Sequence, residues 1–142
     1  MQGWREKMED RYIASLDVSD SVSVFGIFDG HGGSYVSNLA QQTFIKELKG
    51  SQYFIDKNYQ EALIHTFLRI DKIITDGEKC VRPSRNSKYR SVGSTAIVVL
   101  TTETEIYVAN AGDCRAVMCK NGKMLPLSTD HKPNLPSEKQ RI

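Results

Sequence analysis

Apolar and polar positions alternate along the first part of the chain, which is the pattern of half-buried β-strands. This alternation predicts one strand over residues 12–18 and a second over 22–28, where the residues become apolar on both faces toward the end. A turn at 17–21 would join them as an antiparallel hairpin. The face that the first strand is expected to bury consists of Tyr12, Ala14, Leu16 and Val18.

A helical period follows the second strand. One helix is predicted to begin after an N-cap at Ser34 and to stop at Gly50, and another to run from Asn58 to Gly77. Each has a single apolar face, so each is expected to pack on a sheet. The apolar stripes are Val36, Leu39, Ala40, Thr43 and Phe44 in the first helix and Leu63, Phe67, Ile70 and Ile74 in the second.

Strand patterns return in the last third of the chain. The continuous apolar run over 96–100 predicts a fully buried strand, and another strand is expected over 106–110. The dipeptide Asn121-Gly122 predicts a tight hairpin turn between strands over 115–119 and 124–127.

Composition narrows the class of protein. The chain has 142 residues, the length of one domain, with apolar and charged fractions typical of soluble globular proteins. A net charge of +2 is too small to indicate a nucleic-acid partner, and no apolar run could span a membrane. There is no secretory signal, and the three cysteines lack Cys-x-x-Cys spacing, so we expect reduced thiols in an intracellular protein, cytoplasmic or nuclear or both.

Carboxylates gather where the second predicted strand ends. Asp29 stops the apolar run, and the glycine-rich stretch 30–33 follows it. Glu9 and Asp10 precede the first strand, so antiparallel pairing would bring all three acids to the same end of the sheet. A ligand set made only of oxygen suits Mg²⁺ or Mn²⁺ rather than Zn²⁺.

Three further side chains have the chemistry to act beside such a site. Arg5 presents a planar fork suited to phosphate oxygens, His31 could protonate a leaving alkoxide, and Asp113 could add another acid. The plainer interpretations are a solvated charged cluster over 5–11, a structural histidine and an ordinary turn aspartate. The basic segment 79–90 is better explained as a mobile solvated loop than as a docking site.

Six sequence motifs, in this order and spacing, resemble the protein phosphatase 2C family of metal-dependent serine/threonine phosphatases. Each motif is weak alone, but together they are specific and cover nearly the whole chain. They are Gly3-Trp4-Arg5, Met8-Glu9-Asp10, Phe28-Asp29-Gly30-His31-Gly32-Gly33, Gly93-Ser94-Thr95-Ala96, Ala109-Asn110-Ala111-Gly112-Asp113-Cys114-Arg115, and Asp130-His131-Lys132-Pro133 followed by Glu138 and Arg141-Ile142.

The resemblance implies a metal centre built on Asp29. That residue would bridge two Mn²⁺ or Mg²⁺ ions, and Gly30 would give its carbonyl to one of them. Glu9 would be a ligand, direct or through water, and Asp10 would orient a metal-bound water. Asp113 would belong to a third, weaker metal site, with Thr95 near it.

By the same resemblance, Arg5 would bind the substrate phosphate and His31 would be the general acid. The reaction implied is the hydrolysis of phosphoserine or phosphothreonine in protein substrates by metal-bound hydroxide, without a covalent enzyme intermediate. One departure is Gly-Asp-Cys-Arg where the family usually has Gly-Asp-Ser-Arg, which makes Cys114 a candidate target of oxidation.

The resemblance also implies an α+β fold, a sandwich of two antiparallel β-sheets flanked by α-helices in the layer order α-β-β-α. Family members continue well beyond this length and supply further metal-binding aspartates. Residues 1–142 are therefore expected to be the N-terminal part of a single catalytic domain, incomplete at its C-terminus and prone to self-association. The alternative is a catalytically inactive fragment or pseudophosphatase that acts as a binding or regulatory module.

Overall fold

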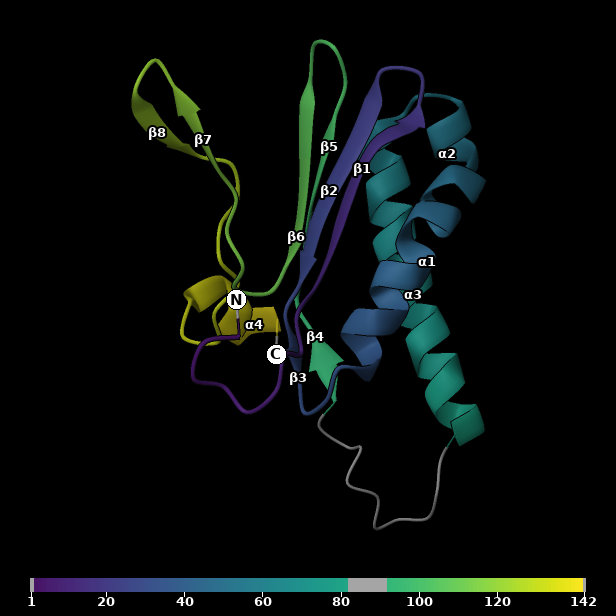
Figure 1. Ribbon diagram of the computed structural model, residues 1–142, viewed down its shortest axis with the longest axis vertical. Coiled ribbons are helices and arrows are strands. Elements are labelled where there is room, and N and C mark those ends of the chain that lie inside the picture. Colours follow the sequence, from purple (N-terminus) through teal and green to yellow (C-terminus); the bar gives the residue numbers. More distant parts are fainter. Residues whose placement is uncertain (1, 82–91, 142) are drawn as a thin grey trace.

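A computed structural model describes residues 2–81 and 92–141 of the chain (Figure 1). The strands are β1 (Arg11–Ser19), β2 (Val22–Phe28), β3 (Gly30–His31), β4 (Gly93–Ser94), β5 (Ala96–Thr101), β6 (Ile106–Ala111), β7 (Val117–Lys120) and β8 (Lys123–Pro126). The helices are α1 (Tyr35–Gly50), α2 (Gln52–Ile55), α3 (Tyr59–Val81) and α4 (Pro136–Arg141). Helices α1 and α3 cover one side of the long strands, and the β7–β8 hairpin projects on the other side (Figure 1).

The largest sheet has four antiparallel strands in the order β1-β2-β5-β6. Arg11 of β1 lies opposite Phe28 of β2, and Ala96 of β5 lies opposite Ala111 of β6. The predicted β1–β2 hairpin is therefore confirmed. Because β1 and β5 begin where β2 and β6 end, four loop segments meet at the same end of this sheet.

Aromatic and aliphatic side chains fill the space between the helices and the sheet. The rings of Phe28 and Phe44 have centroids 6.0 Å apart, and those of Phe44 and Phe67 are 5.8 Å apart. Val24, Val98 and other strand residues pack beneath them with no exposed surface. This layer fixes α1 and α3 on the sheet and so fixes the loop that joins β2 to α1.

The prediction of which face of the first strand is buried is wrong. Tyr12 and Leu16 are 66% and 67% exposed, whereas Ile13 on the opposite face is only 9% exposed. Val18, 2% exposed, joins the buried side because the register of β1 against β2 shifts near the end of β1. Both faces of the strand carry apolar residues, and the helices cover the face that includes Ile13.

The run predicted to be a fully buried strand is buried at three positions and partly buried at the others. Within β5, Ile97, Val98 and Leu100 are buried, but the other residues are half-exposed. Ile27 of β2, which lies opposite Tyr12, is 47% exposed. In the described part of the chain, the helices thus cover one face of the four-stranded sheet and leave the other accessible.

The second helix extends farther than predicted. Gly77 was expected to end it, but α3 continues to Val81. A glycine inside a helix costs about 1 kcal/mol relative to alanine, which the packed apolar face of a long helix can offset. The basic segment expected over 79–90 therefore begins within α3, and its remainder lies outside the described residues. Within the described residues, no helix combines the length and apolar character needed to cross a bilayer.

The hairpin predicted from Asn121-Gly122 is confirmed. Both residues have positive φ, 53° and 73°, as the favoured two-residue hairpin turn requires. Its strands, β7 and β8, are each displaced by one or two residues from the predicted bounds. The short elements α2, β3 and β4 were not predicted, because each has too few residues to show a period.

Candidate metal and phosphate site

A polar cavity of about 190 Å³ opens at the end of the sheet where β2 stops. It is lined by the segment before β1 and by the two residues after β2. Its lining residues are Gln2, Arg5, Lys7, Met8, Glu9, Asp10, Asp29 and Gly30. The fold thus brings together five of the seven predicted site residues, and it leaves His31 and Asp113 outside this cavity.

Asp29 lies at the centre of the electrostatics of this cavity. Partial burial and the neighbouring Asp10, through both its charge and a hydrogen bond between the two carboxyl groups, raise the pKa of Asp29 above its ordinary value. The charge of Asp113 raises this pKa further, and the guanidinium of Arg5 lowers it. Carboxylates held this close repel one another, so the arrangement favours the binding of a proton or a cation.

Backbone contacts bring Asp113 to the same end of the sheet. The Thr95 amide donates a hydrogen bond to the Asp29 carbonyl at 2.9 Å. The Thr95 side chain then packs on the next turn, with its Oγ1 3.1 Å from the Cys114 Sγ atom. Gly112 approaches Thr95 so closely that a Cβ atom there would lie 2.7 Å from the threonine Cβ. Thr95 therefore links the strand end at Asp29 to the turn that carries Asp113.

His31 occupies a different position from the other candidates. It lies in β3, opposite Gly93 of β4, and its side chain is exposed. A Cβ atom at Gly93 would lie 2.5 Å from the His31 Nε2 atom, so the ring rests on the glycine backbone. The imidazole is thus placed beside the carboxylate cavity and not within its lining.

The Asp130-His131-Lys132 motif holds the turn that carries Asp113. Arg115 binds both carboxylate oxygens of Asp130, at 2.8 and 2.9 Å, and the Lys132 ammonium lies 3.1 Å from the same carboxylate. These hydrogen bonds lower the pKa of Asp130 to about 2. The His131 amide donates to the Gly112 carbonyl at 2.8 Å. The motif therefore anchors the turn, a role that its position in the sequence did not reveal.

Side chains of α1 that the sequence reasoning missed hold the segment before β1. The hydroxyl of Ser37 donates to the Glu9 carbonyl at 2.5 Å, and Gln41 Nε2 donates to the Tyr12 carbonyl at 2.8 Å. The one available signal was a serine next to the apolar stripe of the helix. Serine is common in helices for other reasons, so this signal alone would not have identified the contact.

The ligand set fits one hydrated divalent cation. In the part of the chain that the structure describes, no group of three or more His, Cys, Asp or Glu side chains could together hold a metal ion. The paired carboxyl groups of Asp10 and Asp29, with Glu9 lining the same cavity, offer only oxygen atoms. Mg²⁺ commonly takes one or two carboxylates and completes its shell with water, so these residues fit such an ion.

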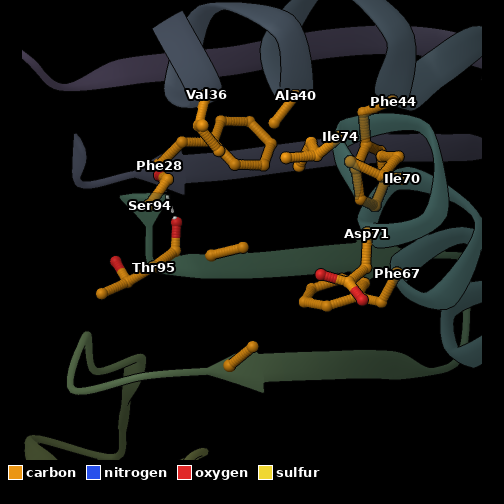
Figure 2. A pocket seen from close by; sticks show the side chains of 12 residues that line it. Phe28, Val36, Ala40, Phe44, Phe67, Ile70, Asp71, Ile74, Ser94 and Thr95 are labelled. Atoms are coloured by element: carbon orange, nitrogen blue, oxygen red, sulfur yellow. Dashed lines mark hydrogen bonds between the residues drawn. The ribbon is translucent and has the colours of Figure 1, made fainter. Parts of the chain in front are cut away.

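A second, mostly apolar cavity of about 120 Å³ lies between α1, α3 and the sheet (Figure 2). Phe28, Phe44 and Phe67 line it, together with the polar residues Asp71 and Thr95 (Figure 2). Phe28 precedes Asp29, and the Thr95 amide binds the Asp29 carbonyl. The packing around this cavity therefore supports the strand end that carries the carboxylate.

Comparison with known proteins assigns the family. The model of the family described as "Protein phosphatase 2C" matches residues 1–142. The chain is 42% identical over 146 residues to "Probable protein phosphatase 2C 2" of Paramecium tetraurelia, covering all of this chain and 49% of that protein. It is 40% identical over 149 residues to "Protein phosphatase 2C homolog 2" of Schizosaccharomyces pombe, covering all of this chain and 38% of that protein.

Solved structures share the fold. A serine-threonine phosphatase 2C from Toxoplasma gondii superposes with a TM-score of 0.81 at 21% identity, over 96% of this chain and 50% of that one. A sex determining protein from C. elegans superposes with a TM-score of 0.82 at 25% identity, over 99% of this chain and 35% of that one. These similarities confirm the expected fold class, antiparallel β-sheets flanked by α-helices.

The chain spans about half the length of the curated relatives from Paramecium that it matches. The family match nevertheless covers every residue of the chain, and the strand ends that carry the candidate ligands occupy one end of the shared fold. The chain therefore belongs to the protein phosphatase 2C family.

Proposed function

We propose that the protein is a metal-dependent serine/threonine phosphoprotein phosphatase whose cations are Mn²⁺ or Mg²⁺. The observation that carries this proposal is the single cavity lined by Arg5, Glu9, Asp10, Asp29 and Gly30. This cavity combines the guanidinium of Arg5, which is suited to phosphate, with oxygen ligands that are suited to hard metal ions. Family membership supports it, and phosphoprotein substrates are the partners that follow.

The carboxylates would hold the metal ions. Asp29 would contact two ions in the complete domain. The Gly30 carbonyl and Glu9 would be further ligands of one of these ions, and Asp10 would orient a bound water. Asp113 would serve a third, weaker site. A divalent cation bound there would lower the pKa of a water molecule and polarise the phosphoryl group.

The substrate would be held and protonated by two other side chains. Arg5 would bind two phosphate oxygens through its planar guanidinium, which lines the same cavity as the carboxylates. His31, beside the cavity, would give a proton to the serine or threonine alkoxide as it leaves. Its side chain is exposed and is therefore accessible to a protein substrate.

Metal-stimulated turnover tests the proposal directly. The full-length natural protein should hydrolyse p-nitrophenyl phosphate and a phosphothreonine peptide when Mn²⁺ or Mg²⁺ is supplied. Excess chelator should abolish both rates, because the ligand set cannot position the reactants without a cation. Undiminished hydrolysis in chelator would contradict the proposal.

The rival function is a binding or regulatory module without catalysis. It is favoured by the absence of a cluster of three ligating side chains within residues 2–81 and 92–141. Such a module would bind phosphopeptides but release them unchanged with or without Mn²⁺. An intracellular location and the lack of a nucleic-acid partner remain predictions alongside either function.

A further inference from the structure

The Glu9–Asp10 segment carries two of the three carboxylates of the cavity, yet it lies outside the sheet. Strand β1 begins only at Arg11, which is the first residue paired with β2. The carboxylates of this segment repel that of Asp29, because like charges that face one another repel. The hydrogen bonds between β1 and β2 do not oppose this repulsion, because the segment precedes the first paired residue. Some other contact must therefore hold this segment against Asp29.

The hydroxyl of Ser37 makes that contact. Ser37 lies on α1, is 0% exposed, and donates its hydrogen bond to the Glu9 carbonyl at 2.5 Å. Its distance to the carbonyl of Ser34, the usual partner within a helix, is longer, at 3.2 Å. The stronger contact of this serine is therefore tertiary and reaches the segment that carries the acids.

Gly30 completes a tightly packed junction around this hydrogen bond. A Cβ atom at Gly30 would lie 2.6 Å from the Glu9 carbonyl oxygen and 2.7 Å from Ser37 Oγ. The backbone after β2, the segment before β1 and α1 thus meet with no room for a methyl group. Moving any one of them would displace the others.

Two neighbouring side chains of α1 hold the next residues along the chain. Arg11 Nε donates to Asn38 Oδ1 at 3.3 Å, and Gln41 Nε2 donates to the Tyr12 carbonyl at 2.8 Å. These contacts secure the start of β1, which the sheet also holds. Arg11 Nη1 also donates to the carbonyl of its neighbour Asp10 at 2.7 Å, so among the described side chains of α1 it is Ser37 that reaches Glu9 itself.

We infer that Ser37 is a positioning residue for the metal site: its hydroxyl fixes the backbone at Glu9 and thereby holds Glu9 and Asp10 against Asp29. The inference rests on the proposed function, since it assigns Ser37 to the same cation site. Groups that orient ligands from behind typically change metal affinity about 10- to 100-fold when removed. A segment left unheld would have to be ordered by the cation as it binds.

The test compares three variants of the full-length natural protein by calorimetric titration with Mn²⁺ and by thermal unfolding without metal. Ser37→Ala removes the hydroxyl. Thr66→Val removes an equally buried hydroxyl that bonds only to the Ala62 carbonyl within α3. Gln41→Ala removes the contact to Tyr12. We expect the Mn²⁺ dissociation constant to rise about tenfold or more in Ser37→Ala alone.

The controls separate positioning from general stability. Thr66→Val and Gln41→Ala should lower the melting temperature yet bind Mn²⁺ like the wild type. If Ser37→Ala binds Mn²⁺ no more weakly than Thr66→Val, the inference is overturned. If Ser37→Ala does not fold, Ser37→Gly replaces it, and wild-type affinity in that variant, which also lacks the hydroxyl, would overturn the inference.

Failure of the proposed function gives a different result. In that case the wild type and Asp29→Asn would bind Mn²⁺ equally poorly, and this result would overturn the metal site and the role of Ser37 together. Tight binding by the wild type that Asp29→Asn abolishes, with Ser37→Ala unaffected, would overturn the role of Ser37 and leave the metal site standing.

Discussion

The imidazole of His31 rests on the backbone of Gly93, so closely that a Cβ atom on the glycine would lie 2.5 Å from Nε2. The two residues face each other across the β3–β4 pair, which closes the end of the sheet beside the carboxylate cavity. The observed position of the His31 ring thus depends on the lack of a side chain at Gly93. This absence lets the ring lie against the glycine backbone.

The contact predicts that Gly93→Ala displaces the His31 ring without unfolding the protein, because the clashing atoms are at the end of a side chain that can rotate. If His31 is the general acid, the variant should slow phenyl phosphate more than p-nitrophenyl phosphate, whose leaving group needs no proton. His31→Ala is the reference and should show a larger effect of the same kind. Equal slowing of both substrates would contradict the acid role.

Asp29→Asn should remove nearly all metal-dependent rate and weaken Mn²⁺ binding strongly. The charges of Asp10, Asp113 and Arg5 all act on the carboxyl group of Asp29. This group is therefore the one that the charged residues of the site have in common. Asparagine keeps the shape and removes the charge. Calorimetric titration with Mn²⁺ measures the loss, and Asp17→Asn, at an exposed position of β1, serves as the control. Wild-type affinity in Asp29→Asn would count against the proposed ligand.

Gly112→Ala should destabilise the folded protein by about 1–3 kcal/mol. Gly112 has φ of 116°, which other residues rarely adopt, and a Cβ atom would lie 2.7 Å from the Thr95 side chain. The matched control is Gly50→Ala at the end of α1, where no atom lies within 4 Å of the added Cβ. That change should be neutral or stabilise by up to about 1 kcal/mol. Urea unfolding measures both, and equal stability of the two variants would contradict the argument.

Stability should depend on pH through Asp130. Arg115 and Lys132 lower its pKa to about 2 in the folded chain, below the ordinary value of about 3.9. A lowered folded-state pKa means that the ionised carboxylate stabilises the fold above about pH 4 and that this contribution disappears as the pH falls toward about 2. The stability difference between wild type and Arg115→Gln should therefore be constant above about pH 5 and shrink below about pH 4.

Carbon NMR of the Asp130 carboxyl group gives an independent measurement. Its pKa should rise toward the ordinary value in Arg115→Gln, because the two hydrogen bonds from the guanidinium are lost. A stability difference that stays constant from pH 6 to about pH 3 would show that this ion pair does not couple folding to pH.

Residues 1–142 expressed alone should self-associate. Tyr12 and Ile27 lie opposite each other on the uncovered face of the sheet, 66% and 47% exposed, and β6 is an outer strand of that sheet. Replacing Tyr12 and Ile27 by threonine should shift the chain toward monomer in sedimentation velocity experiments. Ile55→Thr changes an equally exposed residue on α2 and should leave the association unchanged. A monomeric wild-type chain at high concentration would contradict this expectation.

Local sequence patterns determined the main strands and helices and the end of the sheet at which the acidic residues lie. Alternating strand residues, the Asn121-Gly122 turn and the glycines after Asp29 each act over a few positions, so the sequence alone shows them. Antiparallel pairing of two adjacent strands, confirmed by Arg11 lying opposite Phe28, then brings Asp10 and Asp29 to the same end of the sheet. This part of the fold and of the site could be predicted because two strands joined by a short turn have one simple way to pair, as an antiparallel hairpin.

Only the tertiary structure decided which sheet face is covered and what supports the acids. Both faces of β1 carry apolar residues, so alternation could not distinguish Ile13 from Tyr12, and the helices settled it by packing on one side. The Ser37–Glu9 contact spans 28 positions of the chain, and the His31 ring rests on a glycine 62 positions away. No local period encodes such contacts, because they exist only after distant segments have packed together.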